Sequence, residues 1–264
     1  MTDTIKEPEI EILTEQFIPD HVFVYVAKGT IHCYDGNKHY TFKLGEYFLA
    51  RKNRLAKYSV ENAIDEFEPI IVCLNEAFLK KFQEKHKTKV TNFNLADTFV
   101  KINRNKLIPN FIRSLKPYYD RIEKIDSAFE DVKNEELLII LLKSQPELTG
   151  ILFNYTMPEK IDLEQFMNRN YKFNVSLQRL SFLTGRSLSA FKRDFKTIFN
   201  ETPSRWLLQK RLQEAYFLID KKNEKPTDIY LDLGFEALSH FSFAFKKMFG
   251  HTPTNLHDKK KTCT

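Results

Sequence analysis

The pattern of hydrophobic and polar positions changes along the chain, beginning with short runs rich in aromatic and β-branched residues. Between residues 21 and 71 these runs are broken at three turn signals, residues 28–29, 35–37 and 44–46. Short runs separated by such turns predict strands and hairpins of a small barrel or sandwich. Residues 22–26 are all apolar, so we expect this strand to be covered on both faces.

Beyond residue 75 the apolar residues follow a helical period. The segment EAFLKKFQEKH places Phe78, Leu79 and Phe82 on one stripe, and residues 105–120 and 135–143 continue the helical pattern. Strands therefore come first and helices follow. This order predicts an α+β protein.

A linker interrupts the pattern near Met157. Pro158 stands in NYTMPEKIDLEQF, a segment typical of a linker that leads into a new helix. A chain of 264 residues is long enough for two ordinary domains. We therefore predict one domain at residues 1–157 and a second at residues 158–264.

The second half contains an internal repeat. Residues 191–203 read FKRDFKTIFNETP and residues 241–253 read FSFAFKKMFGHTP, and a glycine, Gly185 or Gly234, stands before each copy. Two further apolar positions precede each glycine at the same spacing, Leu177 and Leu180 in the first copy and Pro226 and Ile229 in the second. Glycine suits a tight turn because it adopts positive φ without steric cost. Each copy therefore predicts a short helix, a turn and a longer second helix, which together form a helix-turn-helix unit.

The phenylalanines of each copy form the inward stripe of its second helix. They are Phe191, Phe195 and Phe199 in the first copy, and Phe241, Phe245 and Phe249 in the second. Ser187 is expected to cap the first of these helices. Pro203 starts a joining helix that continues to about Ile219 and is about 25 Å long. A helix of that length can hold the two stripe-bearing helices about 34 Å apart, one turn of B-DNA.

The face opposite the phenylalanines is polar and basic in both copies. It carries Ser189, Lys192, Arg193 and Lys196 in the first copy, and Ser239, Ser242, Lys246 and Lys247 in the second. A helix that enters a major groove needs such donors and positive charge, and a solvated surface face is the alternative.

The basic character is confined to the same half of the chain. Residues 1–159 carry 22 Lys and Arg against 24 Asp and Glu, a net charge of −2, whereas residues 160–264 carry 19 against 11, a net charge of +8. Such an asymmetry is typical of a polyanion-binding module joined to a nearly neutral domain.

Residues 160–257 resemble the AraC family of bacterial transcription regulators. The most specific stretch, residues 228–256, carries that family's Gly-Phe, Phe-Lys and Gly-x-Thr-Pro at matching spacings. Tyr230 stands where the family has Ala, and Pro226 stands where an apolar β-branched residue is usual. The resemblance implies an all-α DNA-binding domain of two helix-turn-helix units joined by a long helix.

The resemblance also assigns the DNA-contacting positions. Base-reading positions fall on Ser189, Lys192 and Arg193, with Lys196 at a phosphate contact, and in the second helix on Leu238, Ser239, Ser242 and Phe243. Phe243 replaces a residue that is often basic and cannot donate a hydrogen bond. We therefore expect Arg193 and the first helix to carry most direct readout, with a bidentate guanine contact. The second helix is expected to add phosphate contacts, thymine-methyl contacts and indirect readout.

Residues 24–53 resemble, more weakly, the cupin-like β-barrel found in many of these regulators. In such proteins the barrel binds a small effector or a partner protein, and the helices that trail it form a homodimer. The candidate dimer stripe here is Leu137, Leu138, Leu141 and Leu142, and the alternative is a helix buried against its own barrel. The resemblance implies promoter DNA and RNA polymerase as partners and a transcriptional activator, although the residues leave activation against repression and the effector open.

Catalytic motifs are missing from the sequence, so we expect no enzyme, no metal and no cofactor. There is no Gly-x-Ser-x-Gly, no phosphate-binding glycine loop and no Cys-x-x-Cys. A cupin-type enzyme is a remote alternative, because its metal would have to be held by His21, His32 and His39, which form no His-x-His pair.

The remaining composition favours a cytoplasmic protein. The N-terminus is acidic where a signal peptide is basic and then apolar, and no apolar run approaches the roughly 20 residues that span a bilayer. Cys33, Cys73 and Cys263 lie far apart and are expected to be buried fillers rather than a disulfide or metal set.

Overall fold

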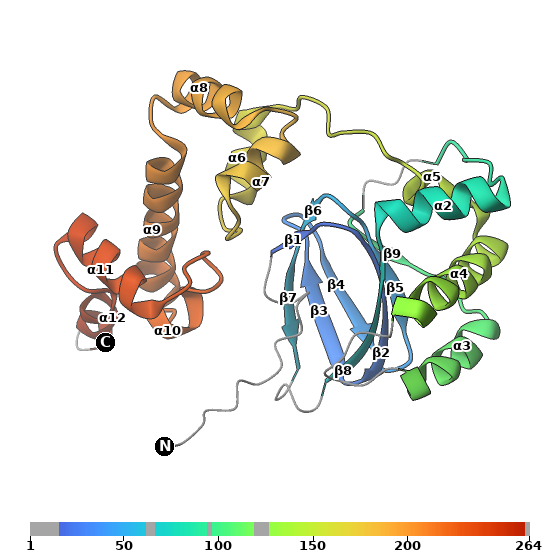
Figure 1. The fold of residues 1–264 in the computed structure, drawn as a ribbon. Helices are drawn as coiled ribbons and strands as arrows, with labels where there is room; N and C mark the ends of the chain where they lie inside the picture. Colours follow the sequence, from blue (N-terminus) through green and yellow to red (C-terminus); the bar gives the residue numbers. More distant parts are fainter. Residues whose placement is uncertain (1–15, 62–66, 94–96, 119–126, 262–264) are drawn as a thin grey trace, which may run out of the picture. The chain divides into compact units, whose positions relative to one another are not determined.

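A computed structural model describes residues 16–61, 67–93, 97–118 and 127–261. The chain divides into two compact units, Met1–Thr156 and Met157–Thr264 (Figure 1). The α+β class is confirmed, because a strand-rich first unit with trailing helices is followed by a helical unit.

The strands of the first unit form antiparallel sheets. Their bounds are Phe17–Ile18 (β1), His21–Lys28 (β2), Thr30–Tyr34 (β3), His39–Lys43 (β4), Tyr47–Ala50 (β5), Arg54–Leu55 (β6), Lys57–Val60 (β7), Glu68–Leu74 (β8) and Phe99–Lys101 (β9). The orders are β8-β2-β5-β9, β4-β3-β7 and β1-β6, all antiparallel. Within the described part of the chain these sheets stay separate and do not close into one barrel.

Strand β2 is covered on both faces, as its apolar run predicts. Val22, Val24 and Val26 belong to a core shared with β3 and β4, whereas Phe23 belongs to a second core shared with helices. The helices of this unit are Glu76–His86 (α2), Leu107–Leu115 (α3), Ser127–Ser144 (α4) and Thr149–Leu152 (α5). Figure 1 shows α2, α3 and α4 on the outer side of the strands, so the four-stranded sheet lies between two apolar layers.

Helix α2 illustrates why the local pattern predicts this part well. It begins after Asn75, whose side chain accepts a hydrogen bond from the backbone N–H of Phe78 at 2.9 Å. Phe78, Leu79 and Phe82 are all buried, as their stripe predicts. The helix ends at Lys87, whose left-handed backbone gives a C-cap.

The leucine stripe of α4 is the face that packs inside the first unit. Leu137, Leu138 and Leu141 are fully buried in the core that also holds Phe23, and Leu142 packs against it. The prediction of a dimer surface on this stripe is therefore wrong, and the alternative, a helix buried against its own domain, is confirmed.

The cysteines follow the prediction only in part. Cys33 is buried, but Cys73 is exposed, and Cys263 lies outside the described residues. Cys73 stands on β8, where side chains alternate between faces, and its neighbours Val72 and Leu74 take the buried positions.

The second unit is a set of helices arranged as two repeats around one long helix. Their bounds are Leu163–Asn170 (α6), Leu177–Leu183 (α7), Leu188–Phe199 (α8), Pro203–Lys222 (α9), Pro226–Ile229 (α10), Leu238–Phe249 (α11) and Pro253–Lys261 (α12). The predicted joining helix is α9, with Pro203 in its first turn, and Gly185 and Gly234 both adopt positive φ at the predicted turns.

Each repeat builds its own core against a different part of α9. Phe191 and Phe195 pack with Leu207 in the first core, whereas Phe241 and Phe245 pack with Leu212 in a second core. An aromatic residue of α9 closes each stripe: the Trp206 ring lies 4.6 Å from Phe199, and the Tyr216 ring lies 4.9 Å from Phe249. The two departures from the family pattern are accommodated, because Pro226 begins α10 and Tyr230 packs against the second core.

Candidate nucleic-acid interface

Helix α8 presents a fixed inner face and a free outer face. It begins after Ser187, whose hydroxyl accepts a hydrogen bond from the Ala190 backbone N–H at 3.3 Å, which confirms the predicted cap. Phe191 and Phe195 are fully buried. The helix is therefore packed along one side and capped at its N-terminus.

The outer face of α8 holds the predicted DNA-contacting residues of the first repeat. Ser189, Lys192, Arg193 and Lys196 are all exposed, and the Arg193 side chain is 78% exposed. Lys196 Nζ donates to the carbonyl of Asn200 at 3.1 Å, at the end of the same helix. Three cationic groups thus lie on the side opposite the phenylalanines.

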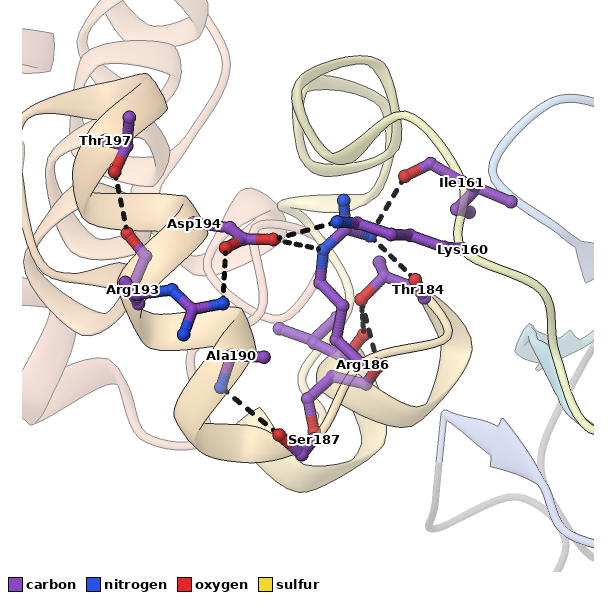
Figure 2. Close-up of polar contacts among 11 residues, drawn as sticks. Lys160, Ile161, Thr184, Arg186, Ser187, Ala190, Arg193, Asp194 and Thr197 are labelled. Carbon is purple, nitrogen blue, oxygen red and sulfur yellow. Dashed lines mark hydrogen bonds and ion pairs between the residues drawn. The ribbon is translucent and has the colours of Figure 1, made fainter.

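A salt-bridge cluster lies directly beside Arg193 (Figure 2). Arg193 Nη2 lies 3.4 Å from Asp194 Oδ1, and Arg186 Nε donates to Asp194 Oδ2 at 3.1 Å, with Lys160 Nζ 3.5 Å from the same oxygen. The hydrogen bond from Arg186, helped by the charges of Lys160 and Arg193, lowers the pKa of Asp194. Asp194 is therefore a fixed anion that orients Arg193 and leaves most of its guanidinium open.

The segment that enters the second unit is docked on the turn of the first repeat. Arg186 Nη1 donates to the carbonyls of Ile161 at 2.9 Å and Thr184 at 2.7 Å, as Figure 2 shows. A Cβ on Gly185 would lie 2.4 Å from the carbonyl oxygen of Glu159. Gly185 is required here both by this close approach and by its positive φ of 65°.

Sequence reasoning missed the roles of Arg186 and Asp194. Arg186 follows the turn glycine and Asp194 lies on the next helix, so no helical or strand spacing relates them. The only signal was the position of a basic residue directly after Gly185, which is too weak to predict an ion pair.

Helix α11 presents a face of different chemistry. Phe241 and Phe245 are fully buried, whereas Phe243 is 71% exposed and Leu238 is 36% exposed. Ser239, Lys246 and Lys247 are exposed and Ser242 is partly buried. Ala237 occupies the N-cap position without a capping side chain. The exposed face of α11 therefore combines an apolar patch near its start with two cations near its end.

His32 and His39, two of the candidate metal ligands, have different neighbours. His32 pairs with Thr41 Oγ1 at 2.9 Å and Glu61 at 3.0 Å, and His39 stacks on the ring of Tyr34 at 4.5 Å. The described residues contain no group of three or more His, Cys, Asp or Glu side chains that could hold a metal ion. In that part of the chain, no helix is both long and apolar enough to cross a membrane.

These features define a class of protein: a DNA-binding regulator with two helix-turn-helix units in one domain. Two family models match the chain, the ExsA N-terminal regulatory domain over residues 21–151 and a helix-turn-helix domain over residues 180–259. The chain belongs to the AraC family of transcriptional regulators and is a regulator rather than an enzyme.

Named relatives cover different shares of the chain. ExsA of Pseudomonas aeruginosa, an HTH-type transcriptional regulator, is 22% identical over 91% of this chain and 87% of its own length. VirF of Yersinia enterocolitica, a virulence regulon transcriptional activator, is 27% identical over 61% of this chain and 60% of its own.

Solved structures with similar elements include whole chains and isolated domains. A ToxT variant from Vibrio cholerae covers 92% of this chain and 90% of its own, at 14% identity and a TM-score of 0.44. An AraC-type DNA-binding domain protein from Chromobacterium violaceum covers 37% of this chain and 87% of its own, at 26% identity and a TM-score of 0.33.

Proposed function

We propose that each chain binds promoter DNA by placing α8 and α11 in two successive major grooves and that it acts in the bacterial cytoplasm. Arg193 and Lys192 of α8 carry most of the direct base readout, and Lys196 contacts phosphate. The observation that carries the proposal is the exposed, cationic face of α8 on a capped and buried helix. A helix fixed on its inner side holds its outer side chains in one register, as base recognition requires.

Helix α11 contributes a different kind of contact in this proposal. Phe243 and Leu238 lie against thymine methyl groups, and Lys246 and Lys247 contact the backbone phosphates. The exposure of Phe243 supports this role, because an exposed aromatic side chain on a basic surface has apolar area available for a base edge. Ser239 and Ser242 supply the hydrogen bonds of this helix.

Genome-wide mapping of bound fragments in the native host tests DNA binding and gives the operator at the same time. The full chain is expected to be enriched at a set of promoters that share one sequence motif. The Lys192→Ala, Arg193→Ala double variant, present at the same level, is expected to lose that enrichment. Enrichment without a shared motif, or equal enrichment of the two proteins, would contradict the proposal.

We also propose that the protein activates transcription through contact with RNA polymerase. The relatives named as virulence regulon transcriptional activators support this direction. Transcription in vitro from a mapped promoter, with purified polymerase, is expected to rise when the full chain is added. A fall in transcript at every mapped promoter would instead assign repression.

For the first unit we propose control by a protein partner rather than by a small effector held between the sheets. The space between them is filled by aromatic side chains: Phe42 stacks on Phe48 at 3.9 Å, and the Phe99 ring lies 5.8 Å from Phe48 and 6.0 Å from Tyr58. A pocket for an effector needs a cavity of a few hundred Å³ at that place. Among the described residues of this unit, a hollow of about 610 Å³ lies away from these rings and is lined by residues 90–93, 150 and 153–156.

Fractionation of a host extract separates the two modes of control. The fraction retained by an ultrafiltration membrane is expected to change the affinity of the full chain for its operator, and protease treatment of that fraction should abolish the effect. If the small-molecule filtrate changes the affinity and the retained fraction does not, control by a small effector replaces control by a partner.

A further inference from the structure

The two helix-turn-helix units are joined at a second place besides α9. The loop at residues 171–174, between α6 and α7, lies against α9 and against the turn of the second repeat. Arg211 of α9 is at the centre of this contact: Nε donates to the carbonyl of Tyr171 at 2.7 Å, Nη2 to that of Phe173 at 2.8 Å and Nη1 to that of Gly234 at 2.9 Å. One guanidinium thus links both repeats.

Two side-chain contacts flank Arg211 at this junction between the loop at residues 171–174, α9 and the turn of the second repeat, which we call the seam. Lys172 Nζ donates to Glu214 Oε1 at 2.7 Å, and Asn174 Nδ2 donates to Glu236 Oε1 at 2.9 Å. The backbones also approach closely, because a Cβ on Gly234 would lie 2.8 Å from the carbonyl oxygen of Lys172. The loop of the first repeat is therefore fitted to the turn of the second.

The chemistry of Arg211 suits a rigid link. A guanidinium is planar, so three carbonyls bound to it are fixed in position relative to one another, which the single ammonium of a lysine does not achieve. Burial lowers the pKa of Arg211 to about 10, so it stays charged at neutral pH. A buried cation whose partners are backbone carbonyls is costly unless all of those bonds are made.

Besides this seam, α9 itself connects the two recognition helices. Leu207 of α9 is buried in the first core and Leu212 in the second, and Leu208 also packs against the second core, so the two repeats meet neighbouring parts of one helix. A connection through a single helix allows bending and twisting between the repeats, whereas a second connection at Arg211 blocks both motions.

We propose that Arg211 is a positioning residue that fixes α8 relative to α11 and thereby sets the spacing of the two operator segments that one chain accepts. The inference rests on the proposed function for its consequence on DNA. Its structural part, the fixed relation of the two helices, holds without DNA and is measured without it.

The first test measures that relation by pulsed electron spin resonance on the full chain without DNA. Nitroxide labels are attached at Ile198→Cys and Met248→Cys, equivalent exposed positions of the two repeats, after the three native cysteines are replaced by serine. We expect one narrow distance distribution, broadened by Arg211→Gln and unchanged by Arg205→Gln. Arg205 is a matched control because it lies on the same helix with its side chain 71% exposed. An unchanged distribution in Arg211→Gln would overturn the proposal.

A second variant keeps the test decisive if Arg211→Gln does not fold. Lys172→Met with Asn174→Ala removes the two flanking contacts and leaves the guanidinium in place. It is expected to broaden the same distribution to a smaller extent. If this variant folds and gives the wild-type distribution, the seam does not fix the two helices.

The second test measures operator spacing. The mapped operator is compared with versions in which one base pair is inserted or removed between its two segments. The wild type and Arg205→Gln are expected to bind the native spacing at least about tenfold more tightly than the altered spacings, which is the effect of a single disrupted contact. For Arg211→Gln this ratio is expected to be about threefold or less. Equal weakening of Arg211→Gln on every spacing would show only a structural role. Failure of the wild type to bind any operator would sink the proposed function and leave the distance measurement standing.

Discussion

At the level of single residues, the candidate interface depends on which charged side chains are buried in ion pairs and which are exposed to solvent. Arg186, with its side chain 7% exposed, is fixed beneath the surface, whereas Arg193 projects from it with its side chain 78% exposed. Asp194 lies between the two and binds both. The two arginines therefore differ: Arg186 holds the anion, and Arg193 is exposed and is proposed to contact DNA.

Arg193→Ala is expected to lower specific affinity and to leave the fold intact. Loss of a bidentate guanine contact costs about 1 to 3 kcal/mol, which is roughly 5-fold to 150-fold in affinity for the operator. Affinity for random DNA should change much less, because only one cation is lost. Fluorescence anisotropy with operator and random duplexes measures both values, and Arg205→Ala is the exposed control. Unchanged discrimination between the two duplexes would remove Arg193 from the readout.

His21 makes the stability of the first unit depend on pH. Burial, followed by the charges of Lys52 and Arg51, lowers the pKa of His21 from 6.5 to about 3. The unfolded chain therefore binds a proton below pH 6.5 before the folded chain does, so the stability is complete above pH 6.5 and falls as the pH drops toward 3. The slope from this one group is about 1.4 kcal/mol per pH unit.

Urea unfolding between about pH 7 and pH 5, above most carboxylate titration, measures this slope. Wild type is expected to lose stability toward pH 5, and His21→Asn is expected to lose about 2 kcal/mol less over that range. Parallel pH profiles for the two proteins would show that His21 is not held neutral by the fold.

At the level of elements, the phenylalanine stripes of α8 and α11 build the two cores, and the opposite faces of these helices are proposed to recognise DNA. The inner positions repeat because each repeat builds the same small core against α9. The outer positions differ, with Lys192 and Arg193 in one copy and Ser242 and Phe243 in the other. The residues that repeat thus build the two cores, and the residues that differ are those proposed to contact DNA.

Phe191→Ala and Ile198→Ala test this division on one helix. Phe191 is fully buried, so its removal is expected to destabilise the second unit by about 3 to 5 kcal/mol. Ile198 is 44% exposed on the same helix, and its removal is expected to cost under about 1 kcal/mol. Chemical denaturation of both variants gives the two values. A stable, DNA-competent Phe191→Ala would show that the inward stripe is misassigned.

The sequence predicted the elements that depend on local pattern. The stripe of α2, the turns at Gly185 and Gly234 and the start of α9 at Pro203 all follow from spacing within a few residues. The direction that the α4 leucines face remained open, because an apolar stripe looks the same whether its partner is its own domain or another chain.

Contacts between segments that lie far apart in the chain could not be predicted from the sequence. Arg211 binds the backbone carbonyls of residues 171, 173 and 234. Every residue has such a carbonyl, so the residue types do not show which ones Arg211 binds. The pair Arg186 and Asp194 crosses a turn whose geometry is set by the close approach of residue 159 to Gly185. Such contacts depend on packing that a single sequence does not specify.

At the level of the whole molecule, the chain combines a nearly neutral unit with a basic one. The charge of +8 in residues 160–264 gives the regulator long-range attraction to DNA, and the exposed faces of α8 and α11 are proposed to convert this attraction into a preference for one sequence. The two contributions respond differently to salt. Non-specific affinity falls steeply with salt, whereas base contacts preserve discrimination.

The most direct measurement is equilibrium binding of the full chain to its mapped operator and to a scrambled duplex of the same composition, across a salt series. We expect the operator to bind at least about 10³-fold more tightly at physiological salt, with the logarithm of each affinity falling linearly with the logarithm of the salt concentration. Equal affinity for the two duplexes, or affinity that does not depend on salt, would contradict sequence-specific recognition by α8 and α11.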